Sequence, residues 1–231
     1  KQNNSILTAA EMAAHTSICQ RLEQLTPAVP VLSEESADIS FDERRNWQQY
    51  WLVDPLDGTR EFVKRNGEFS VNIALIEAGR SILGVIHIPV TDVTYSASLN
   101  NGAKLYHADN LIDAISVRKT NLNNITIAGS RSHGNEKLKQ FINKLDNPEV
   151  LSIGSSLKFC LVAEGKADIY PRFGPTSEWD TGAAQAIVEE AGGIVVDTNY
   201  KRLEYNTKAS LLNPSFLVIA DKDFDWRQYT N

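Results

Sequence analysis

Residues 51–59, with the sequence W-L-V-D-P-L-D-G-T, constrain the fold of this chain more than any other segment. An apolar run that ends in an acid is typical of a buried strand, here with Asp54 at its tip. Pro55 has no N–H to donate, so we expect the strand ladder to stop there. Asp54 and Asp57 would then lie at a rigid strand end, before a glycine that turns the backbone into a short helix. This arrangement suits a divalent cation that holds a phosphate, and an Asp-capped turn is the alternative.

The length and charge of the chain restrict its class and its partners. It has 231 residues, 42% of them hydrophobic and 23% charged, which is ordinary for a globular protein of one large or two small domains. A net charge of −6 without a basic stripe argues against a nucleic-acid polymer as partner, although bound metal ions would still admit an anionic small molecule. We find no run apolar enough to span a bilayer and no signal peptide. The chain begins with Lys1, so we expect that an N-terminal piece is missing.

Two cysteines, Cys19 and Cys160, lie in apolar helical patterns. Such positions favour buried free thiols over a disulfide. This pattern indicates a reducing compartment and therefore a cytoplasmic protein.

The first half of the chain predicts one helix and then a series of strands. Residues 8–11, T-A-A-E, fit a capping box, and the helix should run to about Leu25 with Ile18, Leu22 and Leu25 on its apolar face. A short strand at 29–32 leads to the adjacent acids Glu34 and Glu35, which are usually solvated, and residues 36–46 form a polar loop. Apolar runs then predict an antiparallel meander and two further strands, at residues 69–76, 82–88, 91–98, 102–107 and 112–117.

The second half alternates strands with helices. An Asn-rich stretch at 121–124 divides an N-terminal subdomain (1–123) from a C-terminal one (124–231). The clearest helix begins at Asp180 and is closed by Gly192 and Gly193. Asp180 is either an N-cap or a metal ligand, and one carboxylate can serve as both. The other expected elements are strands at 125–128, 150–153, 167–172 and 194–196, and helices near 138–145 and at 156–164. A meander followed by this alternation predicts an α+β fold or a layered sandwich.

Several rival chemistries can be excluded by spacing. Residues 54–59 resemble the D-x-D-x-T motif of haloacid-dehalogenase phosphatases, but the second acid comes one residue too late, which excludes an Asp nucleophile. Ser155 and Lys158 match the S-x-x-K of penicillin-binding enzymes, yet the sequence contains no K-T-G. It also contains no Walker motif, no dinucleotide fingerprint and no zinc spacing among its histidines. A carboxylate-rich site for a hard cation remains, and this selects magnesium.

Three blocks in this order resemble the inositol monophosphatase superfamily. They are Glu34-Glu35, then D-P-L-D-G-T at 54–59, then W-D-T-G-A-A at 179–184 with A-G-G at 191–193. A finer likeness is to the bacterial 3'(2'),5'-bisphosphate nucleotidases of sulfate assimilation. Residues 60–69, 130–133, 154–160 and 170–176 carry it. The similarity covers nearly the whole chain and weakens after about Asp197.

The resemblance implies an αβαβα sandwich of the inositol monophosphatase and fructose-1,6-bisphosphatase type, without the family helix that precedes the segment matching residues 4–8. A second departure is Glu11, which stands where the family has an Asp that orients the attacking water together with the residue matching Thr59. Glu11 either reaches this water or acts only as the capping-box acid.

The resemblance also implies the roles of the site residues. The carboxylates of Glu34, Asp54, Asp57 and Asp180 and the carbonyl of Leu56 would hold two or three Mg²⁺ ions. Thr59, Glu11 and Glu34 are the expected catalytic residues. The N–H groups of Gly58 and Thr59 would hold the phosphate oxygens. The expected substrate contacts are Glu34, Leu56, Asp57, Gly58, Thr59, His133, Ser155, Lys158, Arg172 and Asp180, with Ser155, Lys158 and Arg172 near a second phosphate.

The function that this resemblance implies is a Mg²⁺-dependent, lithium-sensitive phosphatase that converts adenosine 3',5'-bisphosphate to AMP and phosphate. An inositol or sugar phosphatase of the same superfamily is one alternative. A catalytically impaired metal- or nucleotide-binding protein is another, supported by Glu11 and the missing helix. We expect a monomer or homodimer in the cytoplasm, with a peripheral position on the cytoplasmic face of the inner membrane as the alternative.

Overall fold

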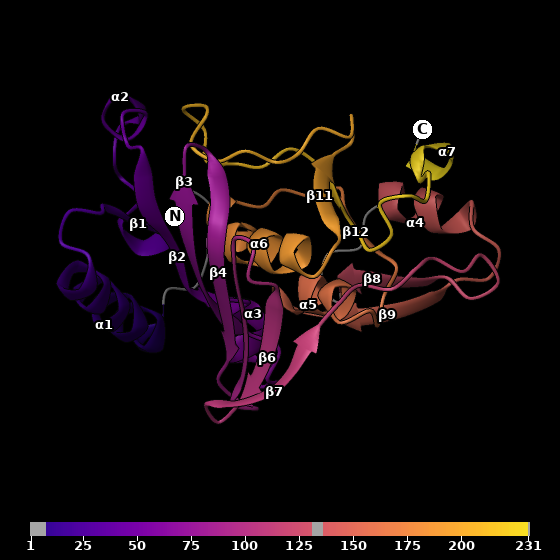
Figure 1. The fold of residues 1–231 in the computed structure, drawn as a ribbon, viewed down its shortest axis with the longest axis horizontal. Helices are drawn as coiled ribbons and strands as arrows, with labels where there is room; N and C mark the ends of the chain where they lie inside the picture. The colour runs from indigo at the N-terminus through magenta and orange to yellow at the C-terminus, as the bar shows by residue number, and fades with distance from the viewer. Residues whose placement is uncertain (1–7, 131–135, 231) are drawn as a thin grey trace.

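A computed structural model of the chain describes residues 8–130 and 136–230. Two mixed β-sheets alternate with layers of helices (Figure 1). Helix α1 (Ala9–Leu25) covers the outer face of the first sheet, and helices α5 (Leu157–Ala163) and α6 (Gly182–Glu190) lie between the sheets. Helices α4 (Glu136–Asn143) and α7 (Arg227–Thr230) lie beyond the second sheet. The predicted αβαβα layering of an α+β protein is therefore confirmed.

The first sheet has the strand order β1-β2-β3-β4-β5-β6-β7. Strand β1 is parallel to β2, and every later neighbour is antiparallel, which confirms the meander. Alternate residues of these strands face the core, among them Leu52, Ala74 and Ile86. The bounds are β1 Val31–Ser33, β2 Gln49–Asp57, β3 Ser70–Glu77, β4 Arg80–Ile88, β5 Val93–Ser98, β6 Ala103–His107 and β7 Asn110–Ile115.

Strand β2 does not stop at Pro55 as predicted. It continues to Asp57, and its register with β3 shifts between Asp54 and Asp57. Pro55 lies inside this irregularity, where the ladder does not need its missing N–H. The bulge keeps both aspartates on one strand, which is followed by the short helix α3 (Thr59–Val63).

Helix α6 packs closely against the first sheet. A Cβ atom at Gly84 of β4 would lie 2.1 Å from the carbonyl oxygen of Ala183, so only glycine allows this approach. The predicted stripe of small and apolar residues on α6, which includes Ala184 and Ile187, is buried. The end of this helix is also as predicted, because Gly192 follows it with a φ of 101°.

The second sheet has the strand order β11-β12-β10-β8-β9. Strand β10 is parallel to β8, and β12 is antiparallel to both of its neighbours. Phe141 of α4 and Trp226 pack on the outer face of this sheet. The sequence did not predict β12 or α7. The bounds are β8 Thr126–Ser130, β9 Glu149–Ile153, β10 Ile169–Arg172, β11 Ile194–Asp197 and β12 Phe216–Ile219.

Helix α1 begins with the predicted capping box. Thr8 Oγ1 accepts the N–H of Glu11 at 3.1 Å, and Glu11 Oε2 accepts the N–H of Thr8 at 3.1 Å. Leu22 is buried, but Leu25, the last residue of the helix, is 73% exposed. The apolar face therefore ends one turn earlier than predicted.

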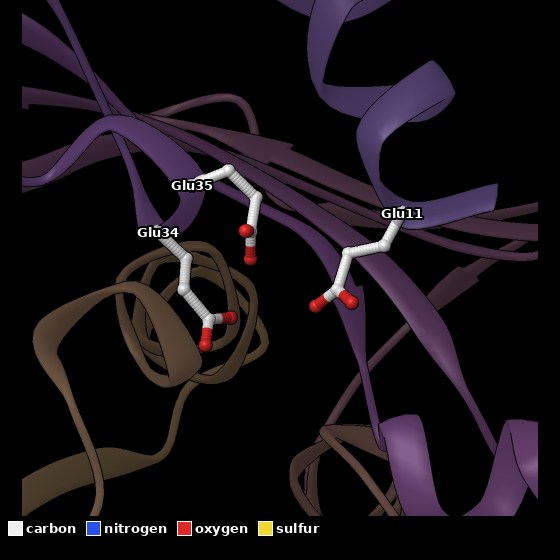
Figure 2. Close-up of side chains that lie close together, drawn as sticks. All are labelled: Glu11, Glu34 and Glu35. Carbon is white, nitrogen blue, oxygen red and sulfur yellow. The ribbon is translucent and has the colours of Figure 1, made fainter. Parts of the chain in front are cut away.

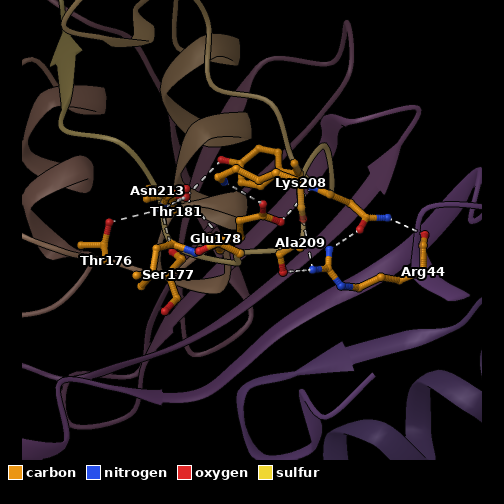
Figure 3. Close-up of polar contacts among 12 residues, drawn as sticks. Arg44, Thr176, Ser177, Glu178, Thr181, Lys208, Ala209 and Asn213 are labelled. Atoms are coloured by element: carbon orange, nitrogen blue, oxygen red, sulfur yellow. Dashed lines mark hydrogen bonds and ion pairs between the residues drawn. The ribbon is translucent and has the colours of Figure 1, made fainter. Parts of the chain in front are cut away.

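The polar loop predicted at residues 36–46 contains helix α2 (Phe41–Arg44). Its single turn carries too few residues for a periodic signal. The run of charges at residues 42–45 is typical of a solvated face, and Asp42, Glu43 and Arg45 are exposed, but Arg44 is only 1% exposed. Its guanidinium donates to Asn206 Oδ1 and to the carbonyls of Lys208 and Ala209 (Figure 3). The buried charge is stabilised by these acceptors.

Other predictions concern the chain as a whole. Cys19 and Cys160 are free, with Cys160 buried and Cys19 partly buried. In the part of the chain that the structure describes, no helix has the length and apolar character needed to cross a membrane. The subdomain boundary at residues 121–124 stays a prediction.

Candidate metal and phosphate site

Three aspartates meet where the first sheet faces the segment before α6. One carboxylate oxygen from each of Asp54, Asp57 and Asp180 lies within 4.8 Å of the others. Asp54 and Asp57 belong to β2, and Asp180 ends the 3₁₀ helix η2 (Glu178–Asp180). The prediction that α6 begins at Asp180 was wrong, because the helix begins at Gly182 after the N-cap Thr181.

Asp180 nevertheless has a capping role. Its Oδ2 accepts the N–H of Ser177 at 2.8 Å, within the capping box of η2. Its other oxygen is not needed for this bond. Capping and binding by one carboxylate are thus compatible, as predicted.

A buried polar network holds the turn that carries Asp180 (Figure 3). Asn213 donates its side-chain amide to the carbonyl of Ser177 at 2.7 Å and to Thr181 Oγ1 at 3.1 Å. Glu178 is fully buried, and its Oε2 accepts the N–H of Asn206 at 2.9 Å. Asn206 and Asn213, which both lie in the segment after β11, therefore hold the turn by hydrogen bonds to Glu178 and Ser177.

The aspartates destabilise one another's charged forms. Burial and the neighbouring Asp57 and Glu34 raise the pKa of Asp54 well above its usual range. Burial, followed by Asp57, raises the pKa of Asp180 to about 8. A cation at this position would favour the charged carboxylates, and four carboxylates fit a hard divalent ion.

Glu11, Glu34 and Glu35 form a second cluster of acids (Figure 2), which is near enough for Glu34 to affect the pKa of Asp54. Glu11 of α1, fully buried, meets Glu34 and Glu35 of the 3₁₀ helix η1 (Glu34–Ser36), with one oxygen of each within 4.8 Å of the others. Glu11 thus caps α1 and also faces Glu34. Adjacent acids after a strand are usually solvated, but Glu34 and Glu35 are both partly buried. Glu35 was not predicted as a site residue, although its place beside Glu34 was a signal.

The turn after β2 depends on Gly58. Its φ of 90° is left-handed, and a Cβ atom there would lie 3.0 Å from the carbonyl oxygen of Glu68. This turn brings Thr59 to the start of α3, with its Oγ1 3.5 Å from the carbonyl oxygen of Leu56. The hydroxyl and the carbonyl therefore lie on the same side of the turn.

A pocket of about 330 Å³ opens beside the aspartates. It brings together seven of the predicted substrate-binding residues: Asp57, Gly58, Thr59, Ser155, Lys158, Arg172 and Asp180. Residues that the sequence did not predict also line it, among them Arg60, Glu61, Tyr170 and Thr176. Glu34 and Leu56 are not among its lining residues, and His133 lies outside the residues that the structure describes.

Two cationic side chains, Lys158 and Arg172, also line this pocket. Lys158 is only 5% exposed, its Nζ donates to the carbonyl of Ile153 at 3.4 Å and to that of Ser155, and it lies 5.4 Å from the centre of the Tyr170 ring. Burial lowers the pKa of Lys158 to about 8. Arg172 Nη2 donates to the carbonyl of Pro175 at 3.0 Å.

Asp57 is held by the turn before α5. Its Oδ2 accepts hydrogen bonds from Ser155 Oγ at 2.7 Å, from Ser156 N at 2.6 Å and from Ser156 Oγ at 2.8 Å. Ser156 was missed by the sequence analysis. So was Asn72 of β3, which contacts Ser156 and lies on the strand face of Ala74 and other core residues. A polar residue in that apolar alternation was the available signal.

Comparisons with known proteins identify the family. The model of the inositol monophosphatase family matches residues 1–225. The chain is 51% identical over 218 residues to the 3'(2'),5'-bisphosphate nucleotidase CysQ of Escherichia coli K12, which covers 94% of this chain and 87% of that protein. The chain belongs to the inositol monophosphatase family.

Solved structures agree with this family. The crystal structure of CysQ from Bacteroides thetaiotaomicron, a bacterial family member, is similar with a TM-score of 0.84 and 42% identity, covering 94% of this chain and 85% of that one. An inositol monophosphatase from Anabaena has a TM-score of 0.79 and 25% identity over 97% of this chain and 85% of its own. These relatives confirm the predicted fold and enzyme class, a phosphoric monoester hydrolase. Enzymes of this family use divalent metal ions, and the acidic clusters described above fit such sites.

Proposed function

We propose that this protein is a Mg²⁺-dependent 3'(2'),5'-bisphosphate nucleotidase that converts adenosine 3',5'-bisphosphate to AMP and phosphate. The observation that carries the proposal is a single pocket lined both by the carboxylates of Asp57 and Asp180 and by the cationic side chains of Lys158 and Arg172. Carboxylates and cations in one pocket suit a substrate with two phosphates, one reacting and one bound. The nucleotidase CysQ of Escherichia coli K12, at 51% identity, supports the same reaction.

The metal ligands would be the five groups predicted from the sequence, holding two or three ions. They are the carboxylates of Glu34, Asp54, Asp57 and Asp180 and the carbonyl of Leu56. Magnesium, when bound, supplies positive charge that lowers the pKa of water and offsets the charge of the phosphate.

The turn at Gly58 and Thr59 would position the reacting groups. The Thr59 hydroxyl can donate to the Leu56 carbonyl, 3.5 Å away, which leaves its oxygen free to accept a hydrogen bond from the attacking water. Glu11 lies in the cluster with Glu34 and would accept the second hydrogen bond from this water. The N–H groups of Gly58 and Thr59 would donate to the phosphate oxygens. Attack in line with the leaving ribose oxygen needs no covalent intermediate.

Lys158 and Arg172, with Ser155, would bind the phosphate that does not react, and His133 is a further proposed nucleotide contact. An inositol or sugar monophosphate has no group to pair with these cations. We place the protein in the cytoplasm, because free Cys19 and Cys160 suit a reducing compartment.

A substrate panel tests the proposal. We expect release of phosphate from adenosine 3',5'-bisphosphate with Mg²⁺ and little release from inositol 1-phosphate. The reverse preference would favour the inositol phosphatase. Binding of the nucleotide without release of phosphate would favour a catalytically impaired protein, and the variant Glu11→Asp would then be expected to restore turnover.

A further inference from the structure

A chain of buried polar side chains links the core of the first sheet to Asp57. Ser70 and Asn72 of β3 are at most 1% exposed, and Ser156 is 2% exposed. Asn72 Nδ2 donates to Ser156 Oγ at 2.9 Å, and Ser156 Oγ lies 2.8 Å from Asp57 Oδ2. Buried polar groups are costly unless each finds a partner, so this chain needs an explanation.

The direction of each hydrogen bond follows from counting protons. The Asn72 amide donates to Ser156 Oγ, so the one proton of this hydroxyl is available to the carboxylate of Asp57. The orientation of the Asn72 amide is set in turn by Ser70, whose hydroxyl donates to Asn72 Oδ1 at 3.0 Å. The order of donors therefore runs from the sheet towards Asp57.

Ser155 provides a second donor to the same oxygen, because its Oγ donates to Asp57 Oδ2 at 2.7 Å. Ser70 Oγ also lies 2.6 Å from Ser155 Oγ, and its single proton can serve either this contact or Asn72 Oδ1. With the N–H of Ser156 at 2.6 Å, Oδ2 accepts three hydrogen bonds. This is enough to satisfy that oxygen and to fix the carboxylate plane, which leaves Oδ1 for another ligand.

We propose that Ser156 and Asn72 are positioning residues for the metal site: they hold Asp57 by Oδ2 so that Oδ1 is presented to the cation together with Asp54 and Asp180. The proposal rests on the metal site of the proposed function. Partners of this kind typically change metal affinity by about 10–100-fold when they are removed. Neither side chain needs to contact the substrate or the metal.

Calorimetric titration of the full chain with Mg²⁺, without substrate, tests the proposal. We expect Ser156→Ala to raise the Kd for Mg²⁺ by about 10-fold or more. Asn72→Ala should raise it less, because the Ser156 hydroxyl, lost in Ser156→Ala, is still present and can still donate to Asp57. The double variant should bind no more weakly than Ser156→Ala, since Asn72 acts through the Ser156 hydroxyl. The KM for adenosine 3',5'-bisphosphate at saturating Mg²⁺ should stay near that of the wild type.

Ser81→Ala is the matched control. Ser81 is 4% exposed, and its hydroxyl donates to the carbonyl of Gly182 at 2.7 Å, with the carbonyl of Leu83 at 3.5 Å, so it is another buried, hydrogen-bonded serine at the same sheet. Its Kd for Mg²⁺ should equal that of the wild type, even if its melting temperature falls as much as that of Ser156→Ala. If Ser156→Ala does not fold without metal, Asn72→Ala decides the question by the same titration.

The outcomes separate the two proposals. Failure of the wild type to bind Mg²⁺ would overturn the proposed metal site. A wild type that binds Mg²⁺, with folded Ser156→Ala and Asn72→Ala that bind it equally well, would overturn the positioning role alone. Equal losses in Ser81→Ala and Ser156→Ala would also overturn it, because the loss would then reflect general destabilisation.

Discussion

At the scale of single residues, Asp57 is the most constrained of the proposed metal ligands, because its Oδ2 already accepts three hydrogen bonds. Asp57→Asn should keep those hydrogen bonds through its amide oxygen, while its NH₂ group replaces the oxygen offered to the cation. Turnover should fall by at least about 100-fold, which is more than we expect when Ser156 or Asn72 is replaced. The melting temperature of the metal-free protein should not fall, because one negative charge has left a repulsive cluster.

Steady-state rates and metal-free melting curves check this expectation. Asp113→Asn, at an exposed position of the edge strand β7, is the control and should change neither. Retention of most Mg²⁺-dependent activity in Asp57→Asn would show that the cation lies elsewhere.

Lys158 and Arg172 distinguish nucleotide from inositol chemistry. Lys158→Met and Arg172→Met keep an apolar stem and remove a charge worth about 1.5–3 kcal/mol to a bound phosphate. The KM for adenosine 3',5'-bisphosphate should rise by about 10-fold or more, and the KM for adenosine 3'-monophosphate should change little. Kinetics on both substrates decide the matter. Equal losses on the two would mean that these side chains are structural.

At the scale of elements, the distance between α6 and the first sheet depends on Gly84. Gly84→Ala would place a methyl group 2.1 Å from the carbonyl oxygen of Ala183, so the helix must move. We expect the free energy of unfolding to fall by about 1–3 kcal/mol, as for other overpacked cores. Activity should also fall, because Asp180 precedes the same helix.

Urea unfolding and turnover measure the two effects. Ser81→Ala changes a neighbouring residue of β4 without adding volume and should keep full turnover. Unchanged stability of Gly84→Ala would mean that the helix and strand are less tightly packed than described.

The elements that the sequence predicted are those with a strong local pattern. Three examples are the capping box of Thr8 and Glu11, the meander strands and the glycines after α6. Each depends on residues that are close in sequence. Arg44 and Asn72 were not predicted, because their partners are distant. Arg44 contacts Asn206 across 162 residues, and Asn72 contacts Ser156 across 84. Charge runs and apolar alternation give no information about such pairings.

The site residues divide in the same way, into those predicted from a local motif and those missed because their partners are distant in sequence. Asp54 and Asp57 could be recognised from one motif, and the resemblance to a family added Glu34 and Asp180. The bulge at Pro55 was missed, because a proline without an N–H predicts the end of a strand unless the partner strand is known. Ser156 was missed because its role depends on the distant Asp57.

At the scale of the whole molecule, the acid cluster makes stability depend on pH and metal. The pKa of Asp180 is about 8 and that of Asp54 is also raised, so the folded state binds more protons than the unfolded state. Without metal, the free energy of unfolding should therefore fall as pH rises from about 4 through 8. Bound Mg²⁺ favours the ionised carboxylates, so its stabilisation should grow over the same range.

Urea unfolding at pH 5, 6.5 and 8, with EDTA or with Mg²⁺, measures both trends. In Asp180→Asn the metal-free slope should be smaller than in the wild type. Lys158, whose pKa is lowered to about 8, is protonated in both states at lower pH, so it adds a pH-dependent gain in stability only from about pH 8 upward and leaves the slope between pH 5 and 6.5 unchanged. A metal-free stability that rises towards pH 8 would contradict the repulsion inferred within the cluster.

The turn of Ser155 and Ser156, which hydrogen-bonds Asp57, has a consequence for the protein during its synthesis. Ser155 lies 98 residues after Asp57 in the chain, and at typical elongation rates a ribosome needs about 5–20 s to add that many. Throughout this interval the growing polypeptide carries Asp54 and Asp57 without the serines that bond Asp57 and without Asp180. If the proposed metal site is right, it is completed only late in translation, and a shorter nascent chain should be inactive.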